Sequence, residues 1–238
     1  MIHAHEVGVH YLFDRQQRTV SPTTAWLRRD AGETWALREV SFRIEGGEAV
    51  ALLGASGSGK STLLRTLADV LQPDEGTMRV DGRVGSLLSV HAGVMSLLTG
   101  RENTSMLGVL AGLTPSEVRQ GMDEVKERSG LGDHFERLVA SYSQGMRARL
   151  GLAVIEQTRP QVLLLDEIHE ALDHEFRDHV AEYAQRLVDD GGIVVATGHD
   201  HPMLQRLGTR ALLLEHGRVV ADGGFRDVQE QYLGAEAG

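Results

Sequence analysis

The sequence lacks cysteine, a surplus of positive charge and long hydrophobic runs, and each absence excludes a class of protein. The absence of cysteine excludes a disulfide framework, an iron–sulfur cluster, a cysteine-based zinc site and a thiol nucleophile. The formal net charge of -10 argues against a protein that coats nucleic acid, because no basic surplus can neutralise the phosphates. Lysine is scarce as well: of 24 basic residues only Lys60 and Lys126 are lysines, which makes each a candidate for a specific role.

The hydrophobic runs have the length of β-strands rather than of membrane spans. The longest, such as residues 162–165 and 193–196, fall far short of the roughly 20 residues that a bilayer requires. The first residues show no basic region followed by an apolar core, so no signal peptide is expected. With 238 residues, 41% of them hydrophobic, the chain can bury a sizeable core, and we expect it to be soluble and cytoplasmic.

Strand-type and helix-type segments alternate along the chain. Short apolar segments predict strands at residues 6–13, 38–44, 49–53, 162–165, 193–197 and 211–214. Apolar residues at helical spacing predict helices at residues 61–71, from 114 onward behind a Thr114 cap, at 144–157 and at 176–187. An extended loop is expected at residues 19–33, and a small strand with a short tail after Gly217. The alternation predicts a parallel sheet covered by helices on both faces.

A glycine-rich segment with a single lysine lies between an expected strand and an expected helix. Residues 54–61 match the phosphate-binding loop pattern G-x-x-x-x-G-K-[ST]. The glycines let backbone N–H groups turn towards a phosphate, and the helix N-terminus adds partial positive charge. Lys60 would reach the β- and γ-phosphate oxygens, and the Ser61 hydroxyl would ligate Mg²⁺. The candidate ATP-binding residues are Gly54, Ala55, Ser56, Gly57, Ser58, Gly59, Lys60, Ser61 and Thr62.

Two acidic residues and one histidine follow expected strands. Asp166 and Glu167 come directly after the strand at residues 162–165, and His199 follows the strand at residues 193–197. Parallel strands deliver such residues to the carboxyl edge of a sheet, where ligands bind. There Asp166 would hold Mg²⁺, Glu167 would polarise the attacking water, and His199 would bond a γ-phosphate. Taken alone, Asp166 and Glu167 would be interpreted as an ordinary acidic loop, and His199 as a structural histidine. The glycine-rich segment upstream favours a functional role for the two acids, and the position of His199 in the order of motifs favours one for the histidine.

Further motifs complete a known order. Ser143 and Gly145 lie in the sequence Ser-Tyr-Ser-Gln-Gly-Met of residues 141–146, and Ala-Leu-Asp occupies residues 171–173. With the glycine-rich loop, the acidic strand and His199, these motifs make the chain resemble the nucleotide-binding subunit of ABC transporters over nearly its whole length. By that resemblance Ser143 and Gly145 match the signature loop, usually LSGGQ. Gln144 and Met146 depart from it, and residues 88–93 lack the glutamine that most members carry there.

The segment Leu-Thr-Gly-Arg-Glu-Asn at residues 98–103 narrows the resemblance. Together with the signature and with Arg147 and Arg149, it is similar to the ATPase of bacterial polysaccharide and teichoic acid exporters. The resemblance implies an α/β fold of the P-loop NTPase type, with a mostly parallel sheet core, an antiparallel β subdomain and a helical subdomain at about residues 95–160. It implies a single nucleotide-binding domain over residues 1–238, without a C-terminal carbohydrate-binding domain.

The same resemblance implies how the protein works. ATP and Mg²⁺ would bind between the phosphate loop of one subunit and Ser143 and Gly145 of a second copy, in a head-to-tail homodimer. The partner would be an integral-membrane permease, docked on residues 87–113, which holds the subunit at the cytoplasmic face of the cell membrane as a peripheral protein. The exported substrate would be a lipid-linked polysaccharide of the O-antigen, galactan or teichoic acid type. Neither nucleic acid nor free glycan is expected to bind.

For the aromatic residue expected to stack on adenine, Trp35 is the first choice and Tyr11 the second. His169 and His174 are five residues apart, one more than the spacing that lets two ligands share a helix face, so no zinc site is expected. The rival functions are an exporter of drugs or other lipids, a soluble ABC ATPase acting on ribosomes or DNA, and a small-molecule kinase with a phosphate loop.

Overall fold

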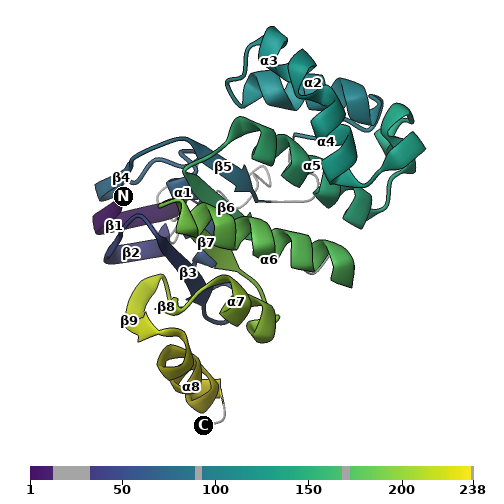
Figure 1. Ribbon diagram of the computed structural model, residues 1–238. Coiled ribbons are helices and arrows are strands. Elements are labelled where there is room, and N and C mark those ends of the chain that lie inside the picture. Colours follow the sequence, from purple (N-terminus) through teal and green to yellow (C-terminus); the bar gives the residue numbers. More distant parts are fainter. Residues whose placement is uncertain (13–32, 89–92, 168–171, 237–238) are drawn as a thin grey trace, which may run out of the picture.

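The computed structural model describes residues 1–12, 33–88, 93–167 and 172–236, and Figure 1 labels its elements. Its strands are β1 (Ile2–Leu12), β2 (Glu33–Ile44), β3 (Glu48–Leu53), β4 (Glu75–Val80), β5 (Val84–Leu87), β6 (Val162–Asp166), β7 (Ile193–Thr197), β8 (Arg210–Glu215) and β9 (Arg218–Gly224). Its α-helices are α1 (Lys60–Leu67), α2 (Gly100–Leu110), α3 (Pro115–Gln120), α4 (Met122–Ser129), α5 (Gln144–Thr158), α6 (His174–Asp189), α7 (His201–Leu207) and α8 (Phe225–Glu236). Two 3₁₀ helices cover Gly132–Glu136 and Val139–Ser141.

A six-stranded sheet forms the centre of the molecule. Its strand order is β5-β6-β7-β3-β8-β9, and all neighbours are parallel except β8 and β9. Alternate residues enter two separate cores: Val50 and Leu52 of β3 face one, and Ala51 and Leu53 face the other. Burial on both faces explains why these strands read as continuous apolar runs in the sequence. The predicted α/β fold with a mostly parallel sheet is confirmed.

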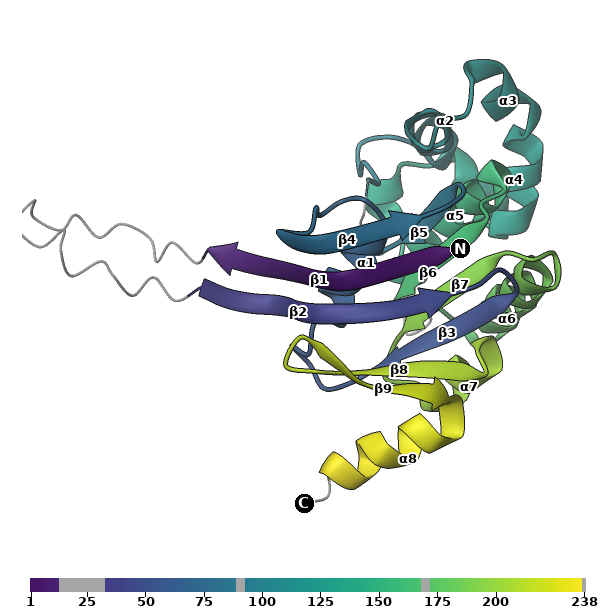
Figure 2. The ribbon, with the colours of Figure 1, turned by 90° about the vertical axis from the view of Figure 1, so that its left-hand side faces the viewer.

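An antiparallel sheet covers one face of the parallel sheet. Its order is β2-β1-β4, and Figure 2 shows the three strands side by side. Apolar residues of β1 and β2, among them Ile2, Val7 and Val40, pack with the leucines of α1 against β3, β6, β7 and β8. The opposite face of the parallel sheet is covered by α5, α6, α7 and α8. The antiparallel β subdomain implied by the resemblance is therefore present.

Helices α2, α3 and α4 and the two 3₁₀ helices form a separate body at the top of Figure 1, which we call the helical lobe. Its apolar side chains make a third cluster, in which the buried Val125 and Phe135 pack together with Leu150 of α5. Helix α5 belongs to both bodies, because Ala148 and Leu152 join the core of the parallel sheet. The lobe thus reaches the sheet through a helix that is apolar on two sides.

The C-terminal part of the described chain corrects one expectation. The sequence predicts only a short tail after the last strand, and this is wrong, because β9 is followed by the 12-residue helix α8. Phe225 and Val228 of α8 are buried in the core of the parallel sheet. Strands β1 and β2 begin at Ile2 and Glu33, ahead of the predicted starts at residues 6 and 38. The loop predicted at residues 19–33 lies almost wholly outside the described residues.

The helix predicted behind Thr114 is in fact two helices, α3 and α4, which meet at Gly121. Gly121 ends α3 and precedes α4, and a Cβ there would meet the end of the Gln157 side chain in α5. Sequence periodicity does not reveal such a break. Strands β4 and β5 and helices α2 and α7 likewise carry no prediction from the sequence.

Candidate functional site

The glycine-rich segment connects β3 to α1 at the carboxyl edge of the parallel sheet. Gly54 and Gly59 have φ angles of 139° and 111°, a region that glycine enters far more readily than other residues. Space is limiting too. A Cβ at Gly54 would lie 2.2 Å from the carbonyl oxygen of Leu214, and one at Gly59 would lie 2.6 Å from that of Ala36. The two glycines therefore allow a tight loop in front of α1.

Lys60 lies against this loop with its ammonium group turned inward. Nζ donates hydrogen bonds to the carbonyl oxygens of Gly54 at 2.6 Å and Ala55 at 2.9 Å, and the residue is 7% exposed. Burial lowers the pKa of the ammonium group, and the charges of Glu167 and Asp166 oppose that shift. The structure therefore brings the lysine of the loop within electrostatic reach of both acids that follow β6.

One buried hydroxyl of the loop finds no hydrogen-bond partner among the described residues. It is Oγ of Ser58, a residue that is 5% exposed. Buried polar groups normally have partners, because an unsatisfied one costs about 1–3 kcal/mol. A phosphate oxygen would supply the missing acceptor. The hydroxyl, the loop amides and the Lys60 ammonium group form a donor set that fits the phosphates of a nucleotide.

Asp166, Glu167 and His199 meet at the carboxyl ends of β6 and β7. Asp166 and Thr197 are register partners, and the Thr197 hydroxyl donates to Oδ1 of Asp166 at 2.6 Å. Nε2 of His199 lies 3.5 Å from Oε1 of Glu167, and both side chains are exposed. Since β7 lies between β6 and β3, these groups stand beside the loop that follows β3.

Thr197 contacts both acids of the candidate site, although the sequence motifs do not single it out. It is fully buried, its hydroxyl orients the Asp166 carboxylate, and its carbonyl oxygen accepts from the Glu167 N–H at 3.1 Å. Glu167 itself has a φ of 55°, a left-handed conformation that costs a non-glycine residue about 1–2 kcal/mol. The only sequence signal for Thr197 is a hydroxyl residue at the end of the strand before His199.

The candidate signature residues begin helix α5. Ser143 is its N-cap: Oγ accepts a hydrogen bond from the Met146 N–H at 3.2 Å, and the residue is exposed. Gly145 follows in the first turn and is partly exposed. Within the described ranges, no hydrogen bond or ion pair joins Ser143 or Gly145 to residues 54–62. The structure therefore does not bring the signature and the glycine-rich loop of one chain together.

Arg149 ties α5 to the segment before α6. Its guanidinium group pairs with Asp173, the N-cap of α6, and lies 4.9 Å from the centre of the Phe176 ring. The pKa of Asp173 lies below its usual range, mainly because its carboxylate accepts a hydrogen bond from the Phe176 N–H and, to a smaller extent, because it contacts Arg149. Ala171 and His169, together with residues 89–92 of the segment without glutamine, lie outside the described residues.

The two aromatic candidates for adenine stacking occupy different surroundings. The Tyr11 hydroxyl lies 3.5 Å from Oγ1 of Thr62, directly behind the glycine-rich loop. The Trp35 ring instead packs 5.3 Å from the ring of His10. Since His10 and Tyr11 are successive residues of one strand, their side chains point to opposite faces of the sheet. Tyr11, the second choice from the sequence, is therefore the aromatic residue on the side of the loop.

A β-bulge explains this arrangement. Val9 pairs with Leu37 whereas His10 pairs with Trp35, so Ala36 is an extra residue on β2. Simple alternation would put Trp35 on the same face as the buried Leu37. The bulge moves it to the face of His10.

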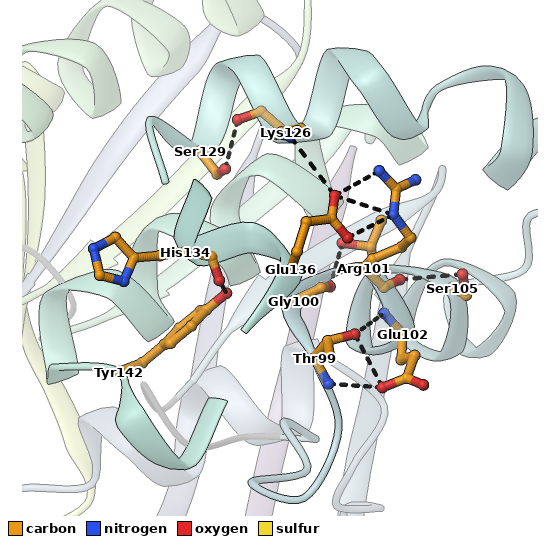
Figure 3. Close-up of polar contacts among 11 residues, drawn as sticks. Thr99, Gly100, Arg101, Glu102, Ser105, Lys126, Ser129, His134, Glu136 and Tyr142 are labelled. Carbon is orange, nitrogen blue, oxygen red and sulfur yellow. Dashed lines mark hydrogen bonds and ion pairs between the residues drawn. The ribbon is translucent and has the colours of Figure 1, made fainter. Parts of the chain in front are cut away.

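The segment at residues 98–103 starts helix α2 and satisfies its own polar groups (Figure 3). Thr99 and Glu102 form a capping box, in which the N–H and hydroxyl of Thr99 donate to Oε2 of Glu102 at 2.8 and 2.9 Å. Arg101 pairs with Glu136 at 2.7 Å. The fully buried Asn103 amide donates to the carbonyl oxygens of residues 95, 98 and 99. These residues thus have structural roles.

The same segment supports the start of α5. A Cβ on Gly100 would lie 2.5 Å from Oη of Tyr142, the residue before Ser143. That hydroxyl donates to the His134 carbonyl oxygen at 2.6 Å (Figure 3). Two backbone hydrogen bonds, of 2.9 and 2.8 Å, also join residues 139 and 140 to residues 98 and 96. The chain before α2 and the chain before the signature are therefore fastened together.

Comparison with known proteins identifies the family of this chain. The profile of the ABC transporter family matches residues 37–170. The chain is 35% identical over 202 residues to the O-antigen export system ATP-binding protein RfbB of Klebsiella pneumoniae. This match covers 85% of this chain and 82% of that protein. It is 32% identical over 198 residues to the teichoic acids export ATP-binding protein TagH of Listeria monocytogenes, which covers 83% of this chain and 59% of that protein.

Solved structures share the fold. The ATP-binding cassette MJ0796, in a dimeric post-hydrolysis state bound to ADP and Pi, has a TM-score of 0.77 at 22% identity, over 95% of this chain and 99% of that chain. Fold and motifs together define an ATP-hydrolysing cassette of the P-loop class. The chain belongs to the ABC transporter family. In the described ranges, no helix combines the length and the apolar character needed to cross a membrane.

Proposed function

We propose that this chain is the ATP-hydrolysing subunit of an exporter that moves a lipid-linked polysaccharide across the cytoplasmic membrane through a separate permease. The observation that carries the proposal is its similarity to RfbB and TagH over 85% and 83% of its length. By their names, RfbB serves O-antigen export and TagH serves teichoic acid export. The segment at residues 98–103, which suggests the same subtype, supports the proposal independently of the phosphate-binding motif.

Each residue of the nucleotide site has a role that follows from its place. Lys60 would turn from the loop carbonyls to the β- and γ-phosphate oxygens, which are stronger acceptors for a cation. The loop amides would hold the β-phosphate, and the Ser58 hydroxyl would gain a partner. Ser61 and Asp166 are the residues that would hold Mg²⁺. When bound, this ion supplies neutralisation of the charge that develops on the phosphates.

Glu167 is the proposed general base. Its carboxylate would take a proton from the attacking water while the water oxygen bonds to the γ-phosphorus and the bond to the bridging oxygen breaks. His199, 3.5 Å from Glu167, would donate a hydrogen bond to a γ-phosphate oxygen. Thr197 would keep the Asp166 carboxylate oriented throughout, because its hydroxyl is fully buried.

For the adenine base we propose Tyr11 in place of Trp35. The contact between the Tyr11 hydroxyl and Thr62 supports this choice, because Thr62 is itself a candidate ATP-binding residue. Aromatic stacking on a base contributes about 1–3 kcal/mol and does not require a particular base. Trp35, which packs on His10, would then stabilise the antiparallel sheet.

The second half of the site would come from another copy of the chain. Ser143 is exposed, and α5 begins there with the partial positive charge of a helix N-terminus, which suits a γ-phosphate. In a symmetric head-to-tail dimer each glycine-rich loop would face the Ser143 and Gly145 of the other subunit. The dimeric state of the structurally similar cassette MJ0796 is consistent with this arrangement.

The permease would dock on the helical lobe. Leu97 is 83% exposed, and Met95 and Leu138 are exposed beside it, since backbone hydrogen bonds join their two segments. Exposed apolar residues that gather in one place suit a protein partner. Met95 and Leu97 lie in the predicted docking segment at residues 87–113. Docking there would hold the subunit at the cytoplasmic face of the membrane as a peripheral protein.

Export in cells and in vesicles tests the proposal. Loss of the gene should leave lipid-linked polymer on the cytoplasmic side of the membrane, and the wild-type chain, but not Lys60→Ala, should restore its export. In vesicles, the lipid-linked polymer should stimulate ATP hydrolysis only when the permease is present. Calorimetry should detect no binding of the free polysaccharide to the chain alone. Normal polymer export without the gene would contradict the proposal.

A further inference from the structure

A buried carboxylate joins three helices at the end of α5 that lies farthest from Ser143. The Glu156 side chain is 0% exposed. Its Oε2 accepts a hydrogen bond from Nη1 of Arg128 in α4 at 2.7 Å, and its Oε1 pairs with Nε2 of His179 in α6 at 2.7 Å. Helix α4 belongs to the helical lobe and α6 to the core of the parallel sheet (Figure 1). The two oxygens of one side chain therefore connect the two bodies.

The charges around Glu156 are balanced by its neighbours. Burial lowers the pKa of Arg128, but the hydrogen bonds and charges of Glu156 and Glu124 outweigh it and raise that pKa. The pKa of Tyr183 in α6 is raised to about 12, mainly by burial and to a smaller extent by the charge of Glu156. Arg128 is therefore a permanent cation, and Tyr183 a neutral neighbour. Such charge-assisted hydrogen bonds are short and directional.

Gln157, the next residue, adds a second connection. Its Nε2 donates to the carbonyl oxygens of Glu117 and Val118 in α3, at 3.2 and 3.4 Å. The last turn of α5 therefore contacts α3 and α4 of the lobe as well as α6 of the core.

Beside this junction, a cleft of about 980 Å³ separates the two bodies. Residues of α3 and α4 line one side, and residues of α6 and the turn at residues 190–192 line the other. Glu156 and Gln157 belong to its lining, at the amino end of β6 and thus at the sheet edge opposite the glycine-rich loop. Because side chains do not fill the cleft, the lobe has room to rotate there, and the junction restrains the rotation.

We propose that Glu156 is a positioning residue that sets the angle between the helical lobe and the core, and thereby the place of Ser143. The link to Ser143 rests on the proposed function. A 15-residue helix is about 22 Å long, so a rotation of roughly 10° about its last turn displaces its first residue by about 4 Å. A hydrogen bond tolerates only a few tenths of an ångström. The apolar contacts on the two sides of α5 are less directional than these hydrogen bonds and restrict the angle less tightly.

The angle can be measured as the distance between two spin labels. Since the chain has no cysteine, Asp133→Cys and Gln185→Cys place labels only on the first 3₁₀ helix, beside the start of α5, and on α6, both at exposed positions. The full chain should give one narrow distance distribution, and Glu156→Gln should broaden it or shift it by about 3 Å or more. The matched control is Arg210→Gln, which breaks two partly buried ion pairs within the core, with Glu48 and Asp222, and should leave the distribution unchanged.

Kinetics of the same variants test the consequence for Ser143. Glu156→Gln should leave ATP affinity within about twofold and lower kcat by about tenfold or more, because only the signature half of the site moves. Unchanged label distances would overturn the positioning role. Changed distances with a wild-type kcat would overturn the link to Ser143 and would count against the composite site of the proposed function. The two failures are therefore distinguishable.

A second variant keeps the test informative if Glu156→Gln does not fold. Arg128→Met, Glu156→Leu and His179→Leu together replace the ion cluster with apolar groups, an exchange that often preserves stability. We expect this folded variant to show a broad label distribution, since apolar packing restricts the direction of the helices less tightly. A distribution as narrow as that of the wild type would overturn the proposal.

Discussion

The carboxyl edge of the parallel sheet and the helical lobe are built differently. The edge gathers groups whose bonding is incomplete or strained, such as the Ser58 hydroxyl without a partner and Glu167 with a left-handed φ of 55°. In the lobe, by contrast, the motif residues satisfy one another: Thr99 and Glu102 form a capping box, and Arg101 pairs with Glu136. Strain and an unsatisfied polar group are expected where a ligand completes the structure, although α5 also carries unpartnered buried atoms, on Arg147 and Gln157. The comparison indicates that the chemistry belongs to the edge.

The two regions also differ in how they relate to a nucleotide. The residues at the edge meet within one chain, because β3, β7 and β6 are neighbours in the sheet. The exposed residue of the lobe's signature, Ser143, has no described bond to the glycine-rich loop of its own chain. Both facts would follow if the edge of one subunit bound the nucleotide and the signature residues of a second subunit completed the nucleotide site. Substitutions in either region test this division of roles.

Glu167→Gln should produce the largest effect. Removal of the general base should slow ATP hydrolysis by about 10²–10⁴-fold, while ATP binding persists because the phosphate-binding residues are unchanged. The uncleaved nucleotide should also hold two subunits together, which size-exclusion chromatography with ATP would detect as a stable dimer. The matched control is Glu182→Gln, an exposed acid of α6. Wild-type turnover in Glu167→Gln would show that Glu167 is not the general base and that the sheet edge does not supply it.

Ser143→Arg tests the lobe's side of the division. The larger, charged residue should lower kcat by about 10²–10³-fold, the loss seen when one hydrogen-bond donor to a developing charge is removed. ATP binding by the single subunit should stay intact, because residues 54–62 are untouched. Fluorescent-nucleotide titration at subunit concentrations too low for dimerisation provides the measurement, with Ser116→Arg in α3 as control.

Mixing two inactive variants makes the test of a shared site more stringent. A dimer of one Ser143→Arg subunit and one Lys60→Ala subunit keeps one site in which both halves are intact. Random mixing should therefore restore about a quarter of the wild-type activity, because half of the dimers are mixed and each has one working site. No recovery on mixing would mean that Lys60 and Ser143 do not act across a dimer interface.

The edge could be predicted from the sequence because each of its motifs is local. The glycine-rich loop follows the strand at residues 49–53, and Asp166 and Glu167 follow the strand at residues 162–165, which the structure shows almost unchanged. The alternation of strands and helices then predicts a parallel sheet, whose carboxyl edge collects such residues. Local pattern and sheet topology together are enough to place the acids beside the loop.

The remaining features depend on contacts between distant segments. The sides taken by Tyr11 and Trp35 depend on the bulge at Ala36, which alternation does not encode. The burial of Glu156 depends on Arg128 and His179, 28 and 23 residues away in the sequence. A glutamate in an amphipathic helix is ordinarily interpreted as a solvent-exposed residue. Only the three-dimensional arrangement distinguishes this one.

Tyr11→Ala and Trp35→Ala separate base stacking from packing at the edge. Loss of a stacking ring should raise the KM for ATP by about 5- to 150-fold in Tyr11→Ala, since stacking contributes about 1–3 kcal/mol. Trp35→Ala should instead lower the melting temperature with KM nearly unchanged, because its ring packs on His10. Tyr11→Phe is the control and should retain most of the affinity. The reverse pattern would restore the first choice from the sequence.

The smallest expected effect concerns Glu102, whose carboxylate completes the capping box at the start of α2. The hydrogen bonds from the backbone and side chain of Thr99 hold the pKa of Glu102 below its usual range. A carboxyl group with a lowered pKa in the folded protein contributes stability above its unfolded pKa of about 4.3 and loses it as the pH falls through the lower folded value.

Glu102→Gln should therefore melt about 1 °C lower than the wild type at pH 7, and the difference should begin to shrink near pH 4 and vanish once Glu102 is protonated in the folded protein. The amide keeps the shape of the side chain but cannot titrate, so the pH dependence isolates the charge. Glu117→Gln in the second capping box, at the start of α3, should behave alike, because Thr114 holds the pKa of Glu117 low in the same way. A difference in melting temperature that persisted at acid pH would show that the carboxylate acts through some contact other than the cap. In that case the polar groups of residues 98–103 would not be satisfied by one another, and this difference between the lobe and the sheet edge would be lost.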